Sequence, residues 1–214
     1  MNMSFKPAAR PLAQSNTDRP TPPMDLRRAS RNDADVMAKL INIAGEGLPV
    51  YLWQNMIEGD ETVWDVGHRR ARHDEGGFSY RNTTLAFGEH QVMGALIDYA
   101  QPDTFDPVDP AEIPAMFVPL LELESLAPES WYINVLSVFP PFRNRGVGSE
   151  LIRAAERNAI NAGKQAISII ASDGNPGAIR LYERHGYTQC AKRTMVKEGW
   201  ENPGKNWILL IKQF

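Results

Sequence analysis

The sequence predicts a mixed α/β fold. Strand-like apolar runs alternate with helical periodicity in the second half of the chain, and an antiparallel strand pair precedes them without any internal repeat. The chain has 214 residues, of which 43% are hydrophobic and 23% charged, so it can bury one substantial core. We expect a single folded domain over residues 24–214, preceded by a flexible, proline-rich tail over residues 1–23.

The beginning of this domain predicts one short strand and two helices. The strand covers residues 26–30, and a helix with an apolar stripe covers residues 33–44 and ends at Gly45. A second helix is expected over residues 61–72, because helix formers dominate there and a glycine-containing loop follows.

The middle of the chain predicts a hairpin and a long connection. Two strand-like runs, residues 81–87 and 92–99, are separated by the short segment 88–91, which is typical of an antiparallel pair. Residues 101–130 contain six prolines and are expected to form a connection, with a helix over residues 116–126.

The second half of the chain has clearer patterns, which predict a central strand followed by a helix. Residues 131–138 are apolar on both faces of a strand, so we expect this strand to be central in its sheet. A glycine-containing turn leads into a helix that ends at Gly163. The apolar stripe of this helix consists of Val147, Leu151, Ala155 and Ala159.

Three further strands and one helix complete the domain. Strands are expected over residues 166–171, 188–196 and 206–211. Between the first two of them, Asn175 caps a helix that begins at Pro176 and ends before Gly186.

Charge and cysteine content exclude several function classes. Lys and Arg total 23 against 26 Asp and Glu, a net charge of −3, which lacks the basic excess of a nucleic-acid binder. Cys190 is the only cysteine, so it forms no intramolecular disulfide, and we expect a cytoplasmic location. No apolar run approaches the roughly 18 residues of a membrane helix, so no membrane partner is expected.

The turn after the central strand has the pattern Arg143-x-x-Gly146-x-Gly148. Glycines at these places let the backbone approach an anion, and the first amides of the following helix are unpaired, with the positive end of the helix dipole behind them. The pattern predicts a phosphate-binding turn. A dinucleotide site needs a third glycine where Leu151 stands, and a Walker motif needs Gly-Lys-Ser/Thr, which is absent. A tight turn with solvated arginines is the alternative.

A second motif, Asn-x-x-Ala-x-x-Leu-Tyr-Glu-x-x-Gly-Tyr, begins at Asn175 and ends at Tyr187. Together with the turn, in this order and separation, it resembles the GNAT superfamily of acetyl-CoA-dependent N-acetyltransferases. The resemblance covers residues 131–196 and implies a splayed, mostly antiparallel sheet with helices on both faces. We expect the sheet to open between the strands over residues 131–138 and 166–171.

The resemblance also implies how coenzyme A is held. The turn amides would bind its pyrophosphate beside the Arg143 side chain, the preceding strand would pair with the pantetheine arm, Asn175 would contact that arm, and Tyr182 would lie by the sulfur. The implied binding residues are Leu136, Ser137, Val138, Arg143, Asn144, Arg145, Gly146, Val147, Gly148, Ser149, Asn175 and Tyr182. Chemistry supports Tyr182 as the acid, because transfer from a thioester expels a thiolate that a phenol can protonate. Packing of Tyr182 against the sheet is the alternative.

The base that deprotonates the acceptor is not assigned by the sequence. An amine with a pKa of about 10.4 is neutral only about once in a thousand molecules at neutral pH, so the site must help to deprotonate it. Members of this superfamily often place a carboxylate or histidine on the central strand, where this chain has Asn134, which cannot accept the proton. Glu122 and Glu124 are the nearest candidates, although their alternating pattern is more typical of a solvated helix face.

Other polar and aromatic residues have plainer interpretations. His68 and His73 flank arginines without a carboxylate or cysteine at ligand spacing, so no metal is expected. His185 is placed near the C-terminal end of its helix. Tyr51 and Trp53 fall where the superfamily places a substrate-facing loop, and they form either a wall of the amine site or part of the core.

We therefore expect an N-acetyltransferase that moves an acetyl group from acetyl-CoA directly to a primary amine of a small molecule or peptide. Direct transfer is favoured because Cys190 has no evident activating partner. A non-catalytic acyl-CoA-binding module and a nucleotide-dependent enzyme remain alternatives. If the chain oligomerises, a homodimer is the expected assembly.

Overall fold

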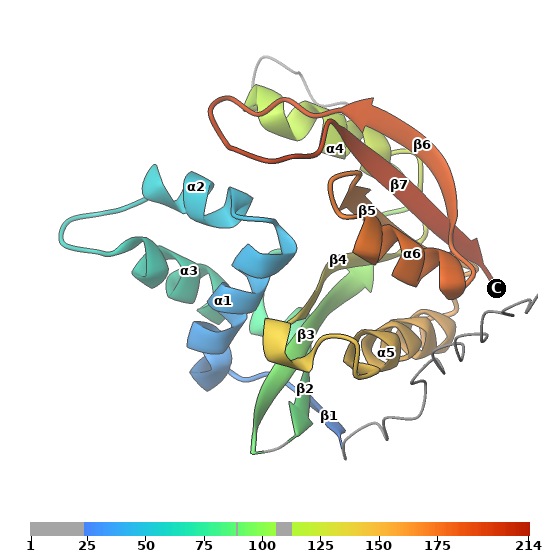
Figure 1. Ribbon diagram of the computed structural model, residues 1–214, viewed down its shortest axis with the longest axis horizontal. Coiled ribbons are helices and arrows are strands. Elements are labelled where there is room, and N and C mark those ends of the chain that lie inside the picture. The colour runs from blue at the N-terminus through green and yellow to red at the C-terminus, as the bar shows by residue number, and fades with distance from the viewer. Residues whose placement is uncertain (1–23, 89, 106–112) are drawn as a thin grey trace, which may run out of the picture.

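One seven-stranded sheet organises the chain in the computed structural model, which describes residues 24–88, 90–105 and 113–214 (Figure 1). The strand order is β1-β2-β3-β4-β5-β7-β6, and only β4 and β5 are parallel. The strands are β1 (Asp25–Arg28), β2 (Thr83–Gly88), β3 (Gln91–Ala100), β4 (Trp131–Val138), β5 (Ala166–Ser172), β6 (Thr188–Thr194) and β7 (Asn206–Gln213). The predicted mixed fold with a central strand at residues 131–138 is confirmed, whereas the predicted tail lies outside the described residues.

Six α-helices cover the sheet within the part of the chain that is described. They are α1 (Ala34–Ala44), α2 (Leu48–Gln54), α3 (Val63–Arg72), α4 (Val118–Glu124), α5 (Val147–Asn161) and α6 (Pro176–Arg184). Adjacent strand residues face opposite layers: Leu85 packs with α1 and α3, whereas Ala86 packs with α5. Because strand side chains alternate, one sheet buries both helical layers, and the predicted helices on both faces are confirmed.

The sheet opens between β4 and β5. Residues 131–133 of β4 pair with residues 167–169 of β5, and the pairing stops there. On the other side of β4, Ile133 and Val135 oppose neighbouring residues of β3, so Asn134 is the extra residue of a β-bulge. The bulge bends β4 away at the residue where its pairing to β5 ends, which confirms the predicted splay.

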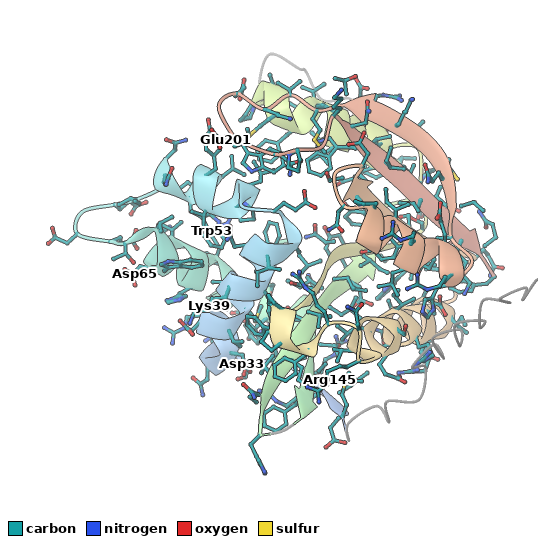
Figure 2. All side chains as sticks on the ribbon, in the orientation of Figure 1. Asp33, Lys39, Trp53, Asp65, Arg145 and Glu201 are labelled. Atoms are coloured by element: carbon teal, nitrogen blue, oxygen red, sulfur yellow. The ribbon has the colours of Figure 1, made fainter. Side chains whose placement is uncertain are left out.

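Helix α2 was not predicted from the sequence. Its seven residues include Pro49, a β-branched valine and two aromatic residues, so propensity does not identify it. It is held by packing: the Trp53 side chain is buried and lies between α2 and α3 (Figure 2). A Cβ placed on Gly67 of α3 would lie 2.5 Å from the Trp53 ring, so the two helices approach closely because residue 67 is glycine.

Element boundaries differ slightly from those predicted. The helix predicted over residues 116–126 is a 3-10 turn at Ala115–Phe117 followed by α4. Strand β6 ends at Thr194 because its partner β7 begins opposite it at Asn206. None of the helices in the described part of the chain is long and apolar enough to cross a lipid bilayer.

Candidate active site

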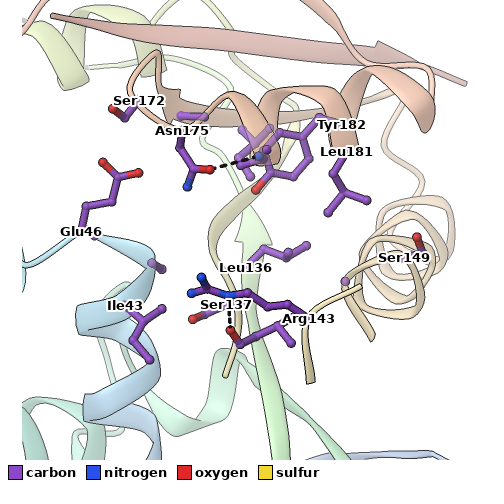
Figure 3. A pocket seen from close by; sticks show the side chains of 18 of the residues that line it. Ile43, Glu46, Leu136, Ser137, Arg143, Ser149, Ser172, Asn175, Leu181 and Tyr182 are labelled. Atoms are coloured by element: carbon purple, nitrogen blue, oxygen red, sulfur yellow. Dashed lines mark hydrogen bonds between the residues drawn. The ribbon is translucent and has the colours of Figure 1, made fainter. Parts of the chain in front are cut away.

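A cavity of about 600 Å³ occupies the opening between β4 and β5 (Figure 3). Its walls come from β4, the turn before α5, the first turn of α5, the end of β5, helix α6 and the end of α1. Each binding residue implied by the resemblance lines this cavity, apart from Arg145 and Val147. The structure therefore brings together two motifs that are about thirty residues apart in the sequence.

The turn before α5 has the geometry of an anion site. Asn144 and Gly146 have positive φ angles of 59° and 83°, and α5 begins directly afterwards at Val147. Within the described residues, the backbone amides of Gly146, Gly148 and Ser149 have no hydrogen-bond partner. The positive end of the helix dipole stands behind these amides, so the turn can bind a phosphate group.

Two side chains of this turn do not face the cavity. Val147 is buried in the core, and the Arg145 guanidinium lies over the Phe142 ring, 5.5 Å from its centroid. The Arg143 side chain folds back instead, and its Nε donates to the Val138 carbonyl oxygen at 3.1 Å (Figure 3). Arg143 nevertheless lines the cavity beside the turn.

Two polar side chains face the middle of the cavity. The Ser137 hydroxyl is buried and has no hydrogen-bond partner among the described residues. Asn175 uses its Oδ1 atom to accept from the Ala178 amide at 3.1 Å, which caps α6 as predicted (Figure 3). The Nδ2 group of Asn175 has no partner in the described chain, so it remains free to donate to a ligand.

Tyr182 is buried and lines the same cavity. Its ring packs against Tyr187, with 6.0 Å between the centroids, so the side chain is both part of the core and part of the cavity wall. Burial raises the pKa of the Tyr182 phenol above its usual range, and the negative charge of Glu46 raises it further. The phenol therefore keeps its proton at neutral pH.

Sequence analysis missed Glu46, a charged residue that lines this cavity. Glu46 projects into it from the loop after α1, opposite Tyr182 in Figure 3, and its carboxylate accepts from Asn202 Nδ2. His185 lies at the end of α6, as predicted, and its Nε2 is 3.1 Å from the Ser149 hydroxyl. A glutamate between two glycines was the only signal for Glu46, and nothing in the sequence indicated the contact between His185 and Ser149.

A second cavity of about 710 Å³ lies beside the first. The two cavities share the residues Ala44, Gly45, Asn134, Ile170 and Trp207, so they meet where β4 bulges and separates from β5. Tyr51 and Trp53 both line the second cavity, and Trp53 also belongs to the core. A donor in the first cavity and an acceptor in the second would thus meet at Asn134.

The two glutamates of α4 have different surroundings. Glu122 is exposed, and its carboxylate forms an ion pair with Arg193. Glu124 is half-buried and lines the second cavity, so the expectation of a solvated face was wrong for this residue. Burial raises the pKa of the Glu124 carboxyl, and the Tyr132 hydroxyl opposes this rise as a hydrogen-bonding neighbour.

No group of three or more metal-ligating side chains is found among the residues that the structure describes. His68 instead lies 3.2 Å from the Asp35 carboxylate on the surface of α3 and α1.

Comparison with known proteins agrees with this geometry. The model of the acetyltransferase (GNAT) family matches residues 56–187, which is more than half of the chain. N-alpha-acetyltransferase MAK3 of Arabidopsis thaliana is 39% identical over 62 residues, or 29% of this chain and 32% of that protein. The match therefore spans about a third of the length of that relative.

Solved structures share the fold. The polyamine N-acetyltransferase of Drosophila melanogaster superposes with a TM-score of 0.62 at 15% identity, covering 90% of this chain and 100% of that one. An N-acetyltransferase from Staphylococcus aureus Mu50 gives a TM-score of 0.61 at 18% identity, covering 88% and 100%. With a turn that has the geometry of an anion site, a splayed sheet and the family match over residues 56–187, this chain belongs to the acetyltransferase (GNAT) family.

Proposed function

We propose that this chain transfers the acetyl group of acetyl-CoA directly to a primary amine. The observation that carries the proposal is the meeting of the two cavities at Asn134. One cavity ends in a phosphate-binding turn and suits the coenzyme, and the other has no such turn and suits an acceptor.

The first cavity offers each part of coenzyme A a suitable partner. The amides at the start of α5 would bind the pyrophosphate, and Arg143 adds a positive charge at its edge. The pantetheine arm would lie along β4 past Ile133, where β5 no longer occupies that edge of the strand. The Ser137 hydroxyl and the Asn175 Nδ2 group are the unpaired polar groups beside that path.

Acyl transfer at the meeting point needs one proton removed and one supplied. The neutral amine nitrogen attacks the thioester carbonyl carbon, a C–N bond forms, and the C–S bond breaks. Backbone amides of β4 near its end would polarise the carbonyl. Tyr182 would donate its proton to the departing sulfur, because burial raises the pKa of the phenol and disfavours the thiolate in the same place.

Direct transfer suits the position of Cys190. Its side chain is exposed on β6 and lines neither of the two cavities. Among the described residues, its sulfur has hydrogen-bond contacts with the Thr188 hydroxyl and carbonyl, which do not activate a thiol. An exposed free thiol also fits the cytoplasmic location that we propose.

The relatives support an amine as the acceptor. Both the Arabidopsis protein and the Drosophila protein are named for acetyl transfer to nitrogen, the first as an N-alpha-acetyltransferase and the second as a polyamine N-acetyltransferase. For this chain we propose a primary amine of a small molecule or peptide. The second cavity, rather than the relatives, selects among these acceptors.

Two measurements on the full chain test the proposal. Thiol release from acetyl-CoA should depend on added primary amine. Melting with acetyl-CoA about a hundredfold above its Kd should show a gain of roughly 2.7 kcal/mol in the free energy of unfolding, which ATP and NAD should not give. Stabilisation by acetyl-CoA without amine-dependent thiol release would indicate a non-catalytic binding module. Stabilisation by ATP or NAD alone would indicate a nucleotide-dependent enzyme.

A further inference from the structure

The second cavity has a largely apolar wall built from α2, α4 and the segments beside α3 and α4. Its large apolar and aromatic side chains include Leu48, Leu52, Trp53, Phe78, Phe117 and Leu120. Such a wall excludes the water that a small, strongly hydrated amine would need, and it favours an acceptor with an apolar body. At about 710 Å³ the cavity has room for a ring or branched chain with polar ends.

Glu124 places a negative charge in this wall. The carboxylate is half-buried, its nearest polar neighbours are the phenols of Tyr132 and Tyr99, and no cationic side chain in the described chain pairs with it. A carboxylate in such surroundings is unfavourable unless a cation or a hydrogen-bond donor approaches it. The Tyr132 hydroxyl supplies a hydrogen bond to this carboxyl, so the partner that a ligand can add is a cationic group.

Arg70 places a positive charge in the same wall. Its guanidinium lies over the Phe78 ring, 5.7 Å from the centroid, and Phe78 also lines the cavity. The Nε atom is buried without a hydrogen-bond partner, and no carboxylate in the described residues pairs with the side chain. Burial and the neighbouring Arg69 lower the pKa of the Arg70 guanidinium, which nonetheless stays charged at neutral pH.

The other carboxylates near the cavity do not compensate these two charges. Glu198 lines the cavity from an exposed position in the loop between β6 and β7. Glu46 lines the first cavity and is bonded to Asn202. Glu124 and Arg70 are thus two groups of opposite charge on one apolar wall, and neither has an ion-pair partner among the described residues.

We propose that the acceptor is an apolar amino-carboxylate, a free amino acid or a short peptide with an apolar side chain. Its ammonium group faces Glu124, its carboxylate group faces Arg70, and its side chain fills the space beside Trp53 and Phe78. This inference rests on the proposed function, since it names the substrate class of the same site.

Glu124 then also removes the proton of the acceptor. Glu124 and Asn134 both line the second cavity, and Tyr132, the neighbour of Glu124, is two positions before Asn134 on β4. The carboxylate takes one proton from the ammonium group, and the freed lone pair attacks the thioester carbonyl. The C–S bond breaks, and the thiolate takes the proton of Tyr182. The second proton that leaves the attacking nitrogen restores the Tyr182 phenol, and Glu124 releases its proton to solvent, so the products are the N-acetyl compound, CoA thiol and one proton.

An acceptor panel on the full chain tests the substrate class. The probes are phenylalanine, 2-phenylethylamine, the dipeptide Phe-Leu, its C-terminal amide, and putrescine. We expect kcat/KM to be at least tenfold higher for an acceptor with a free carboxylate than for its matched partner without one, and lowest for putrescine. Whether phenylalanine or Phe-Leu has the higher value distinguishes a free amino acid from a peptide.

Substitutions of Arg70 and Glu124 test the role of each charged side chain. Arg70→Gln should abolish the preference for a free carboxylate while the value for 2-phenylethylamine changes less than threefold. Glu124→Gln should lower kcat/KM at least a hundredfold for every acceptor while the Kd of acetyl-CoA stays the same. The exposed neighbours on the same helices, Arg72→Gln and Glu122→Gln, are the matched controls and should behave as the unmodified protein.

Equal kcat/KM for acceptors with and without the carboxylate, or an unchanged preference in Arg70→Gln, would overturn the inference. So would full activity of Glu124→Gln. If no amine supports thiol release, the proposed function fails separately, and calorimetry of phenylalanine and Phe-Leu binding to the CoA-loaded protein still decides the inference. If either compound binds and Arg70→Gln raises its Kd at least tenfold, the inference is supported. If neither compound binds, the inference is overturned.

Discussion

At the scale of single residues, Tyr182 combines two roles that are usually separate. Its ring is buried against Tyr187, and yet it forms part of the first cavity wall. Burial and the charge of Glu46 both raise the pKa of the phenol. A raised pKa makes the phenol a weaker acid. The same burial also destabilises the thiolate and raises the pKa of the CoA thiol, so the proton can still move from the phenol to sulfur.

Tyr182→Phe tests this role. We expect kcat at saturating acetyl-CoA to fall by about 10²- to 10⁴-fold, the usual range for loss of a general acid, and the Kd of acetyl-CoA to change little. Tyr187→Phe is the matched control, because its buried hydroxyl has no partner among the described residues and its removal should leave kcat unchanged. An unchanged kcat in Tyr182→Phe would remove this residue from the acid role.

At the scale of elements, the turn before α5 is defined by its backbone. Gly146 has a φ of 83° and is the residue before the first turn of α5, where the unpaired amides begin. A side chain there would be strained, and a negative one would stand among the amides that suit a phosphate. The sequence pattern predicted this turn because glycine spacing reports on backbone geometry directly.

Gly146→Asp should therefore weaken acetyl-CoA binding by at least a hundredfold. Gly163→Asp is the control, since Gly163 also has a positive φ of 71° but lies beyond the other end of α5, with no atom within 4 Å of an added Cβ. Isothermal calorimetry measures the Kd and thermal melting measures stability. Normal acetyl-CoA affinity in a folded Gly146→Asp protein would contradict the phosphate-binding role of the turn.

The contact between α2 and α3 is also set by a glycine. A Cβ at Gly67 would lie 2.5 Å from the Trp53 ring, so Gly67→Ala should lower the free energy of unfolding by about 1–3 kcal/mol through overpacking. Gly177→Ala, in α6, meets only Asn175 Oδ1 at 3.6 Å and should raise stability by about 0.5–1 kcal/mol. Urea denaturation compares the two. Equal effects would show that α2 can shift to make room.

At the scale of the whole molecule, Asp98 connects three elements. It is buried on β3, and its Oδ2 atom accepts from Trp131 Nε1 on β4 at 2.7 Å and from Asn158 Nδ2 on α5 at 2.9 Å. Its Oδ1 atom has no partner in the described residues. Burial raises the pKa of the Asp98 carboxyl despite these two donors.

This raised pKa makes stability depend on pH in a definite direction. Below the unfolded pKa of about 4 the carboxyl is protonated in both states, and as the pH rises above that value the unfolded chain ionises first, so stability is lost. Asp98→Asn removes this loss. The free energy of unfolding of the variant minus that of the unmodified protein should therefore be more positive at pH 7 than at pH 3.5. Urea denaturation at both values measures it, with the exposed Asp25→Asn as control. The same difference at both pH values would contradict the prediction.

The sequence by itself determined the order of the strands and helices around the second motif, the glycine turn before α5 and the family. These features depend on residues close together in the chain: Gly146 and Gly148 for the turn, and Asn175 and Tyr182 on consecutive turns of one helix. The spacing of such residues depends on the backbone geometry of one short segment, so these features could be recognised without knowledge of the fold.

Only the tertiary structure decided where the acceptor cavity lies and which charges it contains. Glu122 and Glu124 are two positions apart, yet one faces solvent and the other faces the cavity, because α4 packs one side against β7 and β6. Arg70 and Glu124 come from helices more than fifty residues apart, and both line the second cavity only because the chain folds α3 and α4 around it. Burial and the absence of a partner depend on all neighbours in space, and no pattern along the chain contains that information.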